Sequence, residues 1–310
     1  MIGLRRALER HVHQMVGFGS GEVDLDRGDA GLFGPQSAAW KVHSDFTAMM
    51  VGGVAALLMQ MLHPGALAGV WDHSDFRADM LGRLRRTAQF VSGTTYGSTE
   101  QAERLIARVR AIHDHVQGVL PDGTGYSAND PILLTWVHVA EVSSFLAAYL
   151  RYRDPDFPVA AQDLYLAETA QIAERLGARD VPKTIAAVHD YFAAMRPALL
   201  ADERAHTVAR ALLSQSPGHP ALAPFGRILL QGGADLLPEW AAQMHGISRP
   251  PSIAVRTGVQ GIGRMMRWAL QDSSAKRAQR RAARLAAQHM IDERAQRGEA
   301  ARGKAGDAIA

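Results

Sequence analysis

The sequence has 310 residues, of which 47% are hydrophobic, and a formal net charge of +3. A chain of this length can bury a large core and needs no disulfide or structural metal to fold. It contains no cysteine, which excludes disulfides, thiolate-bound haem, iron–sulfur clusters and cysteine-ligated zinc. Any metal ligand must therefore be a histidine, aspartate, glutamate, tyrosine or methionine side chain.

The N-terminal lead, residues 1–36, begins with basic residues but does not resemble a signal peptide. Glu9 and Arg10 fall where the apolar part of a signal peptide would run. We therefore expect an intracellular, cytoplasmic protein.

Residues 37–271 show one helical pattern after another. Ser37 is expected to cap a helix over Ala38–Leu62, which Pro64 ends because proline disfavours the helical conformation of the residue before it. The apolar run Met49–Leu62 is 14 residues long, which is short of the ~20 residues that span a bilayer. It predicts a buried central helix.

Two further helices are expected after a short turn that leads to Ser74. The first runs from Ser74 to Val91, and the second begins with a capping box made by Ser98 and Gln101 and ends at Val116. After a turn over 120–125, the remaining helical patterns cover Ile132–Tyr152 (capped by Asn129 or Asp130), Ala160–Leu176, Pro182–Met195, Pro197–Leu213, Pro224–Leu237, Glu239–His245 and Pro251–Gln271.

The fold class follows from what these patterns lack. No segment combines sustained alternation of apolar and polar residues with β-branched enrichment, so a major sheet is not expected. The sequence predicts an all-α fold, a multi-helix globular bundle that forms a single domain over residues 37–271.

The tail, residues 272–310, carries the positive charge. It has nine Lys/Arg and five Asp/Glu, a balance of +4, which leaves −1 for the first 271 residues. The basic cluster Lys276–Arg281 and its alanine-rich continuation predict a solvated helix that frays into disorder. Peripheral contact with an anionic membrane surface is the alternative, because clustered cations attract such a surface; we do not expect nucleic acid as a partner.

Helical phase separates two histidines near the end of the second helix. Ala102 and Ile106 mark its apolar face, on which His113 also lies. His115 points about 200° of helical arc away from His113. His113 is therefore the inward histidine, although a lone inward histidine is more often a core residue than a ligand.

Arg83, Arg86 and Thr87 stand at i, i+3 and i+4 and share one helix face. Guanidinium groups beside apolar neighbours must be paired or face water, because burying an unpaired charge is costly. A bound anionic cofactor would satisfy them. The alternative is a solvated basic face with Asp75 and Asp79 as local partners.

Two other places carry polar groups that could serve a pocket. His63 could face one together with Gln60, although a histidine at a helix end is commonly only a cap. Glu141 follows His138 by three residues on one helix, which favours a hydrogen-bonded pair within the core.

A series of short stretches occurs in a fixed order between Trp40 and Gly177, about half of the chain. They are Leu62-His63-Pro64 with Gly69-Val70, Asp75-Phe76-Arg77, Gly82-Arg83-Leu84-Arg85-Arg86-Thr87, Tyr96-Gly97, Ile112-His113, Val116-Gln117-Gly118, and Tyr126-Ser127-Ala128-Asn129-Asp130-Pro131 into Leu133-Leu134-Thr135-Trp136-Val137-His138. In this order they resemble the haem-dependent oxygenase family of latex-clearing proteins (rubber oxygenases) and the mycophenolic-acid-pathway oxygenase.

The resemblance implies an all-helical fold, related to the globin-like core of rubber oxygenases, that holds haem b. His113 matches the proximal iron ligand, and Arg83 and Thr87 match residues near the haem. Arg86 falls where rubber oxygenases carry a lysine, which keeps the charge but not its geometry.

One departure concerns the reaction. Rubber oxygenases place a glutamate, proposed as the base in polyisoprene cleavage, upstream of the arginine. This chain has no glutamate between Glu22 and Glu100. The departure argues against polyisoprene cleavage.

We therefore predict a haem b-dependent oxygenase that uses dioxygen, with His113 as iron ligand, to oxidise an apolar, lipid-like small molecule beside the Met49–Leu62 helix. Arg83, Arg86, Thr87 and His63 are the predicted catalytic residues, with His63 or Gln60 as distal donor. Three alternatives stay open: a protein that binds haem or an apolar ligand without turnover, a non-haem metal enzyme that uses histidines such as His138, and a purely structural helical protein.

Overall fold

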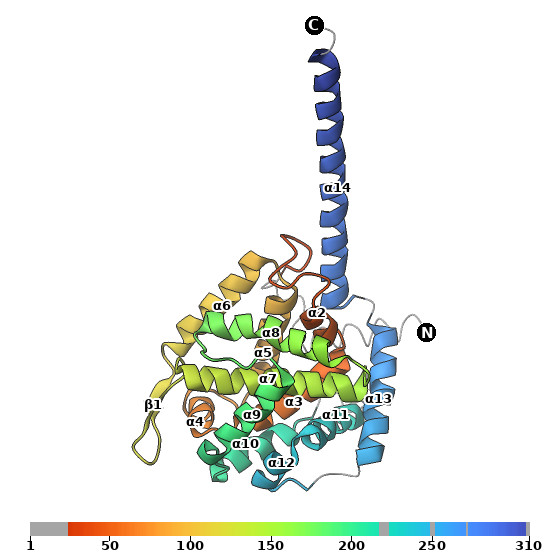
Figure 1. The fold of residues 1–310 in the computed structure, drawn as a ribbon. Coiled ribbons are helices and arrows are strands. Elements are labelled where there is room, and N and C mark those ends of the chain that lie inside the picture. Colours follow the sequence, from red (N-terminus) through yellow and green to blue (C-terminus); the bar gives the residue numbers. More distant parts are fainter. Residues whose placement is uncertain (1–23, 217–222, 249–251, 271, 308–310) are drawn as a thin grey trace.

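The computed structural model describes residues 24–216, 223–248, 252–270 and 272–307. Within these ranges helices form nearly all of the regular structure, and two short strands make a hairpin (Figure 1). The all-α prediction is therefore confirmed. The helices are α2 (Ala38–His43), α3 (Phe46–Gln60), α4 (Pro64–His73), α5 (Met80–Tyr96), α6 (Thr99–His113), α7 (Pro131–Tyr152), α8 (Val159–Leu176), α9 (Ile185–Met195), α10 (Glu203–Leu213), α11 (Ala223–Leu236), α12 (Glu239–Met244), α13 (Ser252–Ala269) and α14 (Ser274–Asp307).

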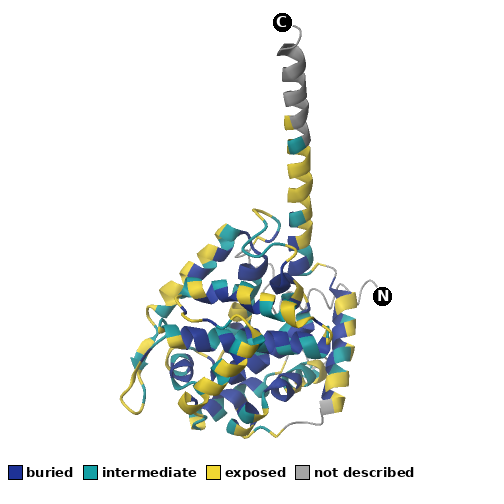
Figure 2. Cartoon of the chain, in the orientation of Figure 1, coloured by how far each residue is buried: buried dark blue, intermediate teal, exposed yellow. Residues whose placement is uncertain are grey.

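The helices α3 and α7 form the centre of the bundle. Both are buried around most of their circumference (Figure 2), as expected of helices that are apolar on all sides. They come close at Gly52, where an added Cβ would lie 2.9 Å from the Cα of Phe145. The Met49–Leu62 run thus lies in a buried central helix, as predicted.

The prediction of one continuous helix over Ala38–Leu62 is wrong, because the helix is interrupted after His43. Asp45 starts α3 as its N-cap, and its Oδ1 accepts a hydrogen bond of 2.9 Å from the N–H of Ala48. The buried Oδ2 of the same carboxylate lies 2.7 Å from Nη1 of Arg267. Capping and charge pairing together favour a new helix start over a continuous helix.

The predicted short turn between His63 and Ser74 is also wrong, because this segment forms α4. Pro64 stands at the first helical position, where its missing N–H costs nothing. The ring of His63 caps the helix, since its Nδ1 accepts a hydrogen bond of 3.1 Å from the N–H of Gly65.

The helix α5 begins and ends later than the predicted Ser74 and Val91. Asp79 is its N-cap, with Oδ1 accepting a hydrogen bond of 2.8 Å from the N–H of Gly82. The helix then continues to Tyr96. A capping aspartate therefore sets the start more strongly than the serine does.

The capping box of Ser98 and Gln101 at the start of α6 is confirmed. The helix ends at His113 instead of the predicted Val116, because the strand β1 (Gln117–Val119) follows directly. The strand β1 pairs antiparallel with β2 (Gly125–Ser127). The turn between the two strands was predicted.

The later helices lie close to their predicted ranges, with one exception. Asp130 caps α7 and Pro131 opens it, as predicted. The predicted helix over Pro197–Leu213 is instead a short 3₁₀ turn, Arg196–Ala198, followed by α10. Asp202 separates the two, because its side chain caps α10.

The tail forms α14, which projects from the body of the bundle (Figure 1). Its first turns are not solvated, since Ala275 and Arg281 are buried. The guanidinium of Arg281 donates to the carbonyls of Leu25 (3.0 Å) and Tyr96 (2.8 Å). The prediction of a solvated basic cluster is wrong at Arg281, because carbonyls that include the C-terminal end of α5 attract its charge.

Within the described ranges, two elements are apolar enough to cross a membrane by length and composition. They are α7, and the pair α3 and α4, which is bent by 104°. Buried helices of globular proteins pass the same test, and 67% of the α7 window is buried within the fold. We therefore describe both as core elements.

Candidate functional site

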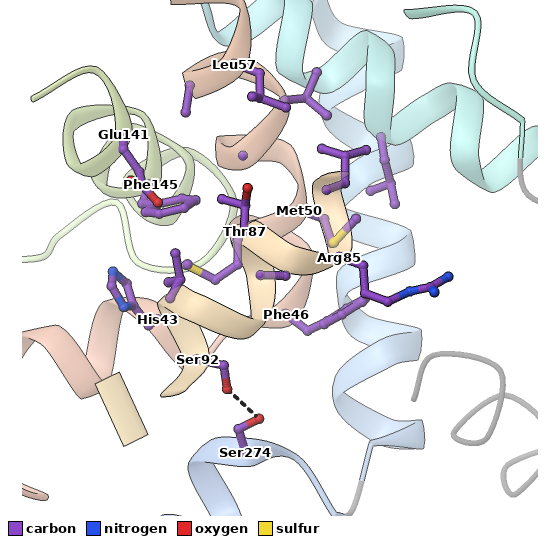
Figure 3. A pocket seen from close by; sticks show the side chains of 18 of the residues that line it. His43, Phe46, Met50, Leu57, Arg85, Thr87, Ser92, Glu141, Phe145 and Ser274 are labelled. Carbon is purple, nitrogen blue, oxygen red and sulfur yellow. Dashed lines mark hydrogen bonds between the residues drawn. The ribbon is translucent and has the colours of Figure 1, made fainter. Parts of the chain in front are cut away.

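A cavity of about 470 Å³ lies between α3, α5, α7, α11 and the start of α14 (Figure 3). Its volume falls within the range of roughly 300–1,000 Å³ that is usual for small-molecule sites. Most of its wall is apolar and includes Phe46, Met50, Leu57 and Phe145. The cavity therefore suits an apolar molecule.

The helix α5 presents different faces to the cavity and to its other neighbours. Leu81 and Ala88, two turns apart, line the cavity. Arg83 and Arg86 lie about 150° around the helix from this stripe, and neither lines the cavity. Thr87 lies between the two faces and contributes to the cavity wall.

His43 lies at one side of the cavity (Figure 3), and each of its ring nitrogens is within hydrogen-bond distance of a hydroxyl. Its Nδ1 is 2.8 Å from the hydroxyl of Thr95, and its Nε2 is 2.8 Å from the hydroxyl of Tyr165. Burial, together with nearby His138, lowers the pKa of His43 to about 3. His43 is thus a neutral part of the wall whose hydrogen bonds are satisfied.

Glu141 of α7 lies near Phe145 in the same wall (Figure 3). Its Oε1 is buried and has no hydrogen-bond partner. Burial raises the pKa of Glu141 from 4.5 to about 7. Among the cavity-lining residues that the structure describes, Glu141 alone has a buried side-chain polar atom without a partner.

The predicted hydrogen bond between His138 and Glu141 is not formed, since Oε1 of Glu141 is unpartnered and no bond joins the two side chains. Burial lowers the pKa of His138 to about 4. Both side chains are partly buried, and they do not pair with each other. Their spacing of three residues on α7 is not sufficient to bring their polar atoms together.

His113 ends α6 and is partly buried, whereas His115 is exposed. Burial lowers the pKa of His113, so the imidazole is neutral at pH 7. Its Nδ1 is buried and has no hydrogen-bond partner. Ile112, the residue before it, is 53% exposed.

The two arginines of α5 differ in their surroundings. Arg83 is half-buried, and the described residues offer it no acidic partner. Burial, together with nearby Arg86, lowers the pKa of Arg83 to about 10. Arg86 is exposed, with Nη1 at 3.5 Å from the carboxylate of Asp79. Arg83 therefore lacks the anion that Arg86 has.

His63 and Gln60 also differ. The ring of His63 caps α4 and lies 6.2 Å from the ring of Trp136, and it does not line the cavity. Gln60 does line the cavity, and its Nε2 donates a hydrogen bond of 3.2 Å to the carbonyl of Val137. The catalytic role of His63 remains a prediction.

Of the five predicted catalytic and ligand residues, Thr87 lines this cavity, as does Gln60, the alternative distal donor. The hydroxyl of Thr87 donates a hydrogen bond of 3.2 Å to the carbonyl of Arg83. The wall of this cavity does not include Arg83, Arg86, His63 or His113. Among the described residues, no group of three or more His, Asp or Glu side chains could hold a metal ion. The histidines of the non-haem alternative therefore do not form such a group there.

Sequence reasoning missed His43 altogether. The available signal was its place in a short apolar helix, because a histidine that follows Ala39 by four residues and Trp40 by three shares their buried face. Its partners Thr95 and Tyr165 come from distant parts of the chain, so the sequence could not reveal the network.

Residues 40–269, roughly three quarters of the chain, match the family described as "ER-bound oxygenase mpaB/B'/Rubber oxygenase, catalytic domain". The chain belongs to this family. It therefore carries an oxygenase catalytic domain of the mpaB and rubber oxygenase type, whose reaction uses dioxygen and a substrate. No curated protein and no solved structure matches the chain.

Proposed function

We propose that this chain is a haem b-dependent oxygenase that uses dioxygen to oxidise an apolar small molecule. The observation that carries the proposal is the partly buried, neutral imidazole of His113 within an oxygenase domain. A neutral imidazole is the usual haem ligand in a chain without cysteine.

Two features of the described residues fit haem. The imidazole of His113 makes no hydrogen bond, and its Nδ1 is buried, so the ring is available to hold the iron. The half-buried guanidinium of Arg83 lacks an anion and would pair with a haem carboxylate. When bound, haem would supply the iron centre at which dioxygen is activated.

The chain's own residues have distinct tasks in this proposal. Arg83 pairs with a carboxylate of the haem and so orients the cofactor. Thr87 lies one turn further along α5, on the cavity wall. The apolar wall of the cavity excludes water and admits the substrate beside α3. Arg86 contributes positive charge from the exposed side of the same helix.

The test is the ultraviolet-visible spectrum and iron content of protein expressed with a haem precursor. We expect a Soret band in the wild type and its loss in His113→Ala, while circular dichroism shows an unchanged helix content. His115→Ala is the matched control, because it removes an exposed histidine two residues away, and its Soret band should remain.

A haem-loaded His113→Ala protein with an unaltered spectrum would contradict the assignment of the iron ligand. A wild-type protein that takes up no haem under these conditions would contradict the cofactor. Oxygen consumption in the presence of an apolar substrate then separates an oxygenase from a binding protein without turnover.

A further inference from the structure

We propose that the cavity between α3, α5, α7 and α11 selects neutral, lipid-like molecules that carry one oxygen function, and that Glu141 recognises this oxygen. The inference rests on the proposed function in one respect, since it names the substrate class of that oxygenase. Binding itself does not require turnover, so it can be measured separately.

The polar side chains that line the cavity differ in whether their hydrogen bonds are satisfied. His43 has a partner at each ring nitrogen, and the hydroxyl of Ser92 donates to that of Ser274 at 3.1 Å (Figure 3). The amide of Gln60 donates to a backbone carbonyl. Glu141 is different, because its buried Oε1 has no partner.

Glu141 can donate the hydrogen bond that it lacks. Burial raises the pKa of Glu141 to about 7, so a substantial share of the carboxyl groups is protonated at neutral pH. A protonated carboxyl donates one hydrogen bond and can accept others. A ketone, ester or alcohol oxygen can therefore complete it without burying a charge.

Pure hydrocarbons and fatty-acid anions suit this cavity less well. A pure hydrocarbon fills the apolar wall but leaves the carboxyl of Glu141 without a partner, and an unsatisfied buried polar group is costly. A fatty-acid anion would bring its negative charge into a mostly apolar cavity, and moving a charge out of water is costly. A neutral oxygen function on an apolar chain avoids both costs.

The experiment measures displacement of Nile red from the purified protein by three probes of equal chain length: 2-undecanone, undecane and undecanoate. For each protein, the affinity for 2-undecanone is divided by the affinity for undecane. Because every variant is tested with the same two probes, their difference in hydrophobicity cancels when these ratios are compared. We expect this ratio to fall by about tenfold in Glu141→Leu, because that variant removes the hydrogen bond.

Glu141→Gln serves as the conservative variant, since its amide is neutral and still donates. It should keep the preference for the ketone. In the wild type, affinity for the ketone should fall between pH 6 and 8 as Glu141 loses its proton, and Glu141→Gln should lack this change. The pH profile also keeps the test decisive if Glu141→Leu does not fold.

Met50→Trp is the second control, because Met50 lines the cavity at a distance along the wall from Glu141 (Figure 3). The larger side chain should weaken binding of both neutral probes. A ketone-to-alkane ratio that is the same in the wild type and Glu141→Leu would overturn the inference. Tighter binding of undecanoate than of undecanone in the wild type would also overturn it.

Failure of this inference can be distinguished from failure of the proposed function. Haem content is read from the Soret band of the same preparations, and ligand selection is read from the displacement curves. Glu141-dependent binding without haem would support the cavity assignment and contradict the oxygenase proposal. Loss of the Soret band in folded Met50→Trp would show that haem occupies the cavity and would overturn the inference.

Discussion

Two of the described regions that hold polar side chains without partners differ in charge and enclosure. The cavity beside α3 is apolar and holds Glu141, which lacks a hydrogen bond. The second region comprises Arg83 at the start of α5 and His113 at the end of α6, both partly exposed and outside the cavity wall. Its two groups are a cation and a neutral imidazole.

Under the two proposals, the two regions bind different ligands. A protonated carboxyl in an apolar cavity suits a neutral molecule with an oxygen atom, whereas a guanidinium and an imidazole suit an anionic, iron-containing cofactor. Thr87 lies on α5 between the two faces. We therefore expect changes in one region to leave ligand binding in the other largely intact.

The largest expected effect is on the pH dependence of stability through Glu141. Its pKa is raised from 4.5 to about 7, so this carboxyl binds more protons in the folded than in the unfolded state in this interval. The contribution of Glu141 to stability should therefore fall as pH rises from 4.5 through 7, by at most about 3 kcal/mol, while His43 and His138, whose pKa values are lowered, contribute in the opposite direction.

Urea unfolding at several pH values measures this slope. The stability of the wild type relative to Glu141→Gln should fall over this interval, while Glu239→Gln, which changes an exposed glutamate, should follow the wild type. Parallel curves for all three proteins would show that Glu141 is not protonated preferentially in the fold, and the distinction between a neutral and a cationic region would fail.

A smaller effect is expected from Gly52→Ala at the contact of α3 with α7. The new Cβ would lie 2.9 Å from both Cα and Cδ1 of Phe145, so the helices must separate. We expect a loss of about 2 kcal/mol in the free energy of unfolding and weaker Nile red binding in the neighbouring cavity.

Gly53→Ala is the matched control for this prediction. A Cβ there would lie 3.8 Å from Cε1 of Phe145, which is ordinary contact. Because alanine favours a helix over glycine, stability should be unchanged or rise by up to about 1 kcal/mol. Equal losses in both variants would mean that helix contact at Gly52 does not set the cavity wall.

The smallest effect concerns the second region. Arg83→Met removes a half-buried cation that lacks an acidic partner, so the haem-free protein should gain about 1 kcal/mol in stability. Haem should dissociate faster from this variant. Arg86→Met should change stability by less than about 0.5 kcal/mol, because the exposed pair with Asp79 contributes little. Thermal unfolding and haem transfer to apomyoglobin provide the measurements.

The helical class followed from periodicity and caps, and the starts of α6 and α7 were predicted correctly because Ser98 and Asp130 cap them locally. The break before α3 was not predicted. Asp45 starts that helix while paired with Arg267 from a distant segment, and a single sequence does not show this pairing.

The site was predicted less completely than the fold. Helical phase chose His113 over His115 in agreement with their burial, because phase depends only on spacing within one helix. The network around His43 joins α2 to α5 and α8, and Oε1 of Glu141 is left without a partner beside it. Such contacts arise from tertiary packing, so residue spacing could not reveal them.

The most direct test of two separate sites is an anomalous-scattering map at the iron edge from crystals of haem-loaded protein. The account predicts one iron peak bonded to the imidazole of His113, with a haem carboxylate on Arg83 and no haem density beside Glu141. An iron peak within the cavity, next to Phe145 and Glu141, would contradict it.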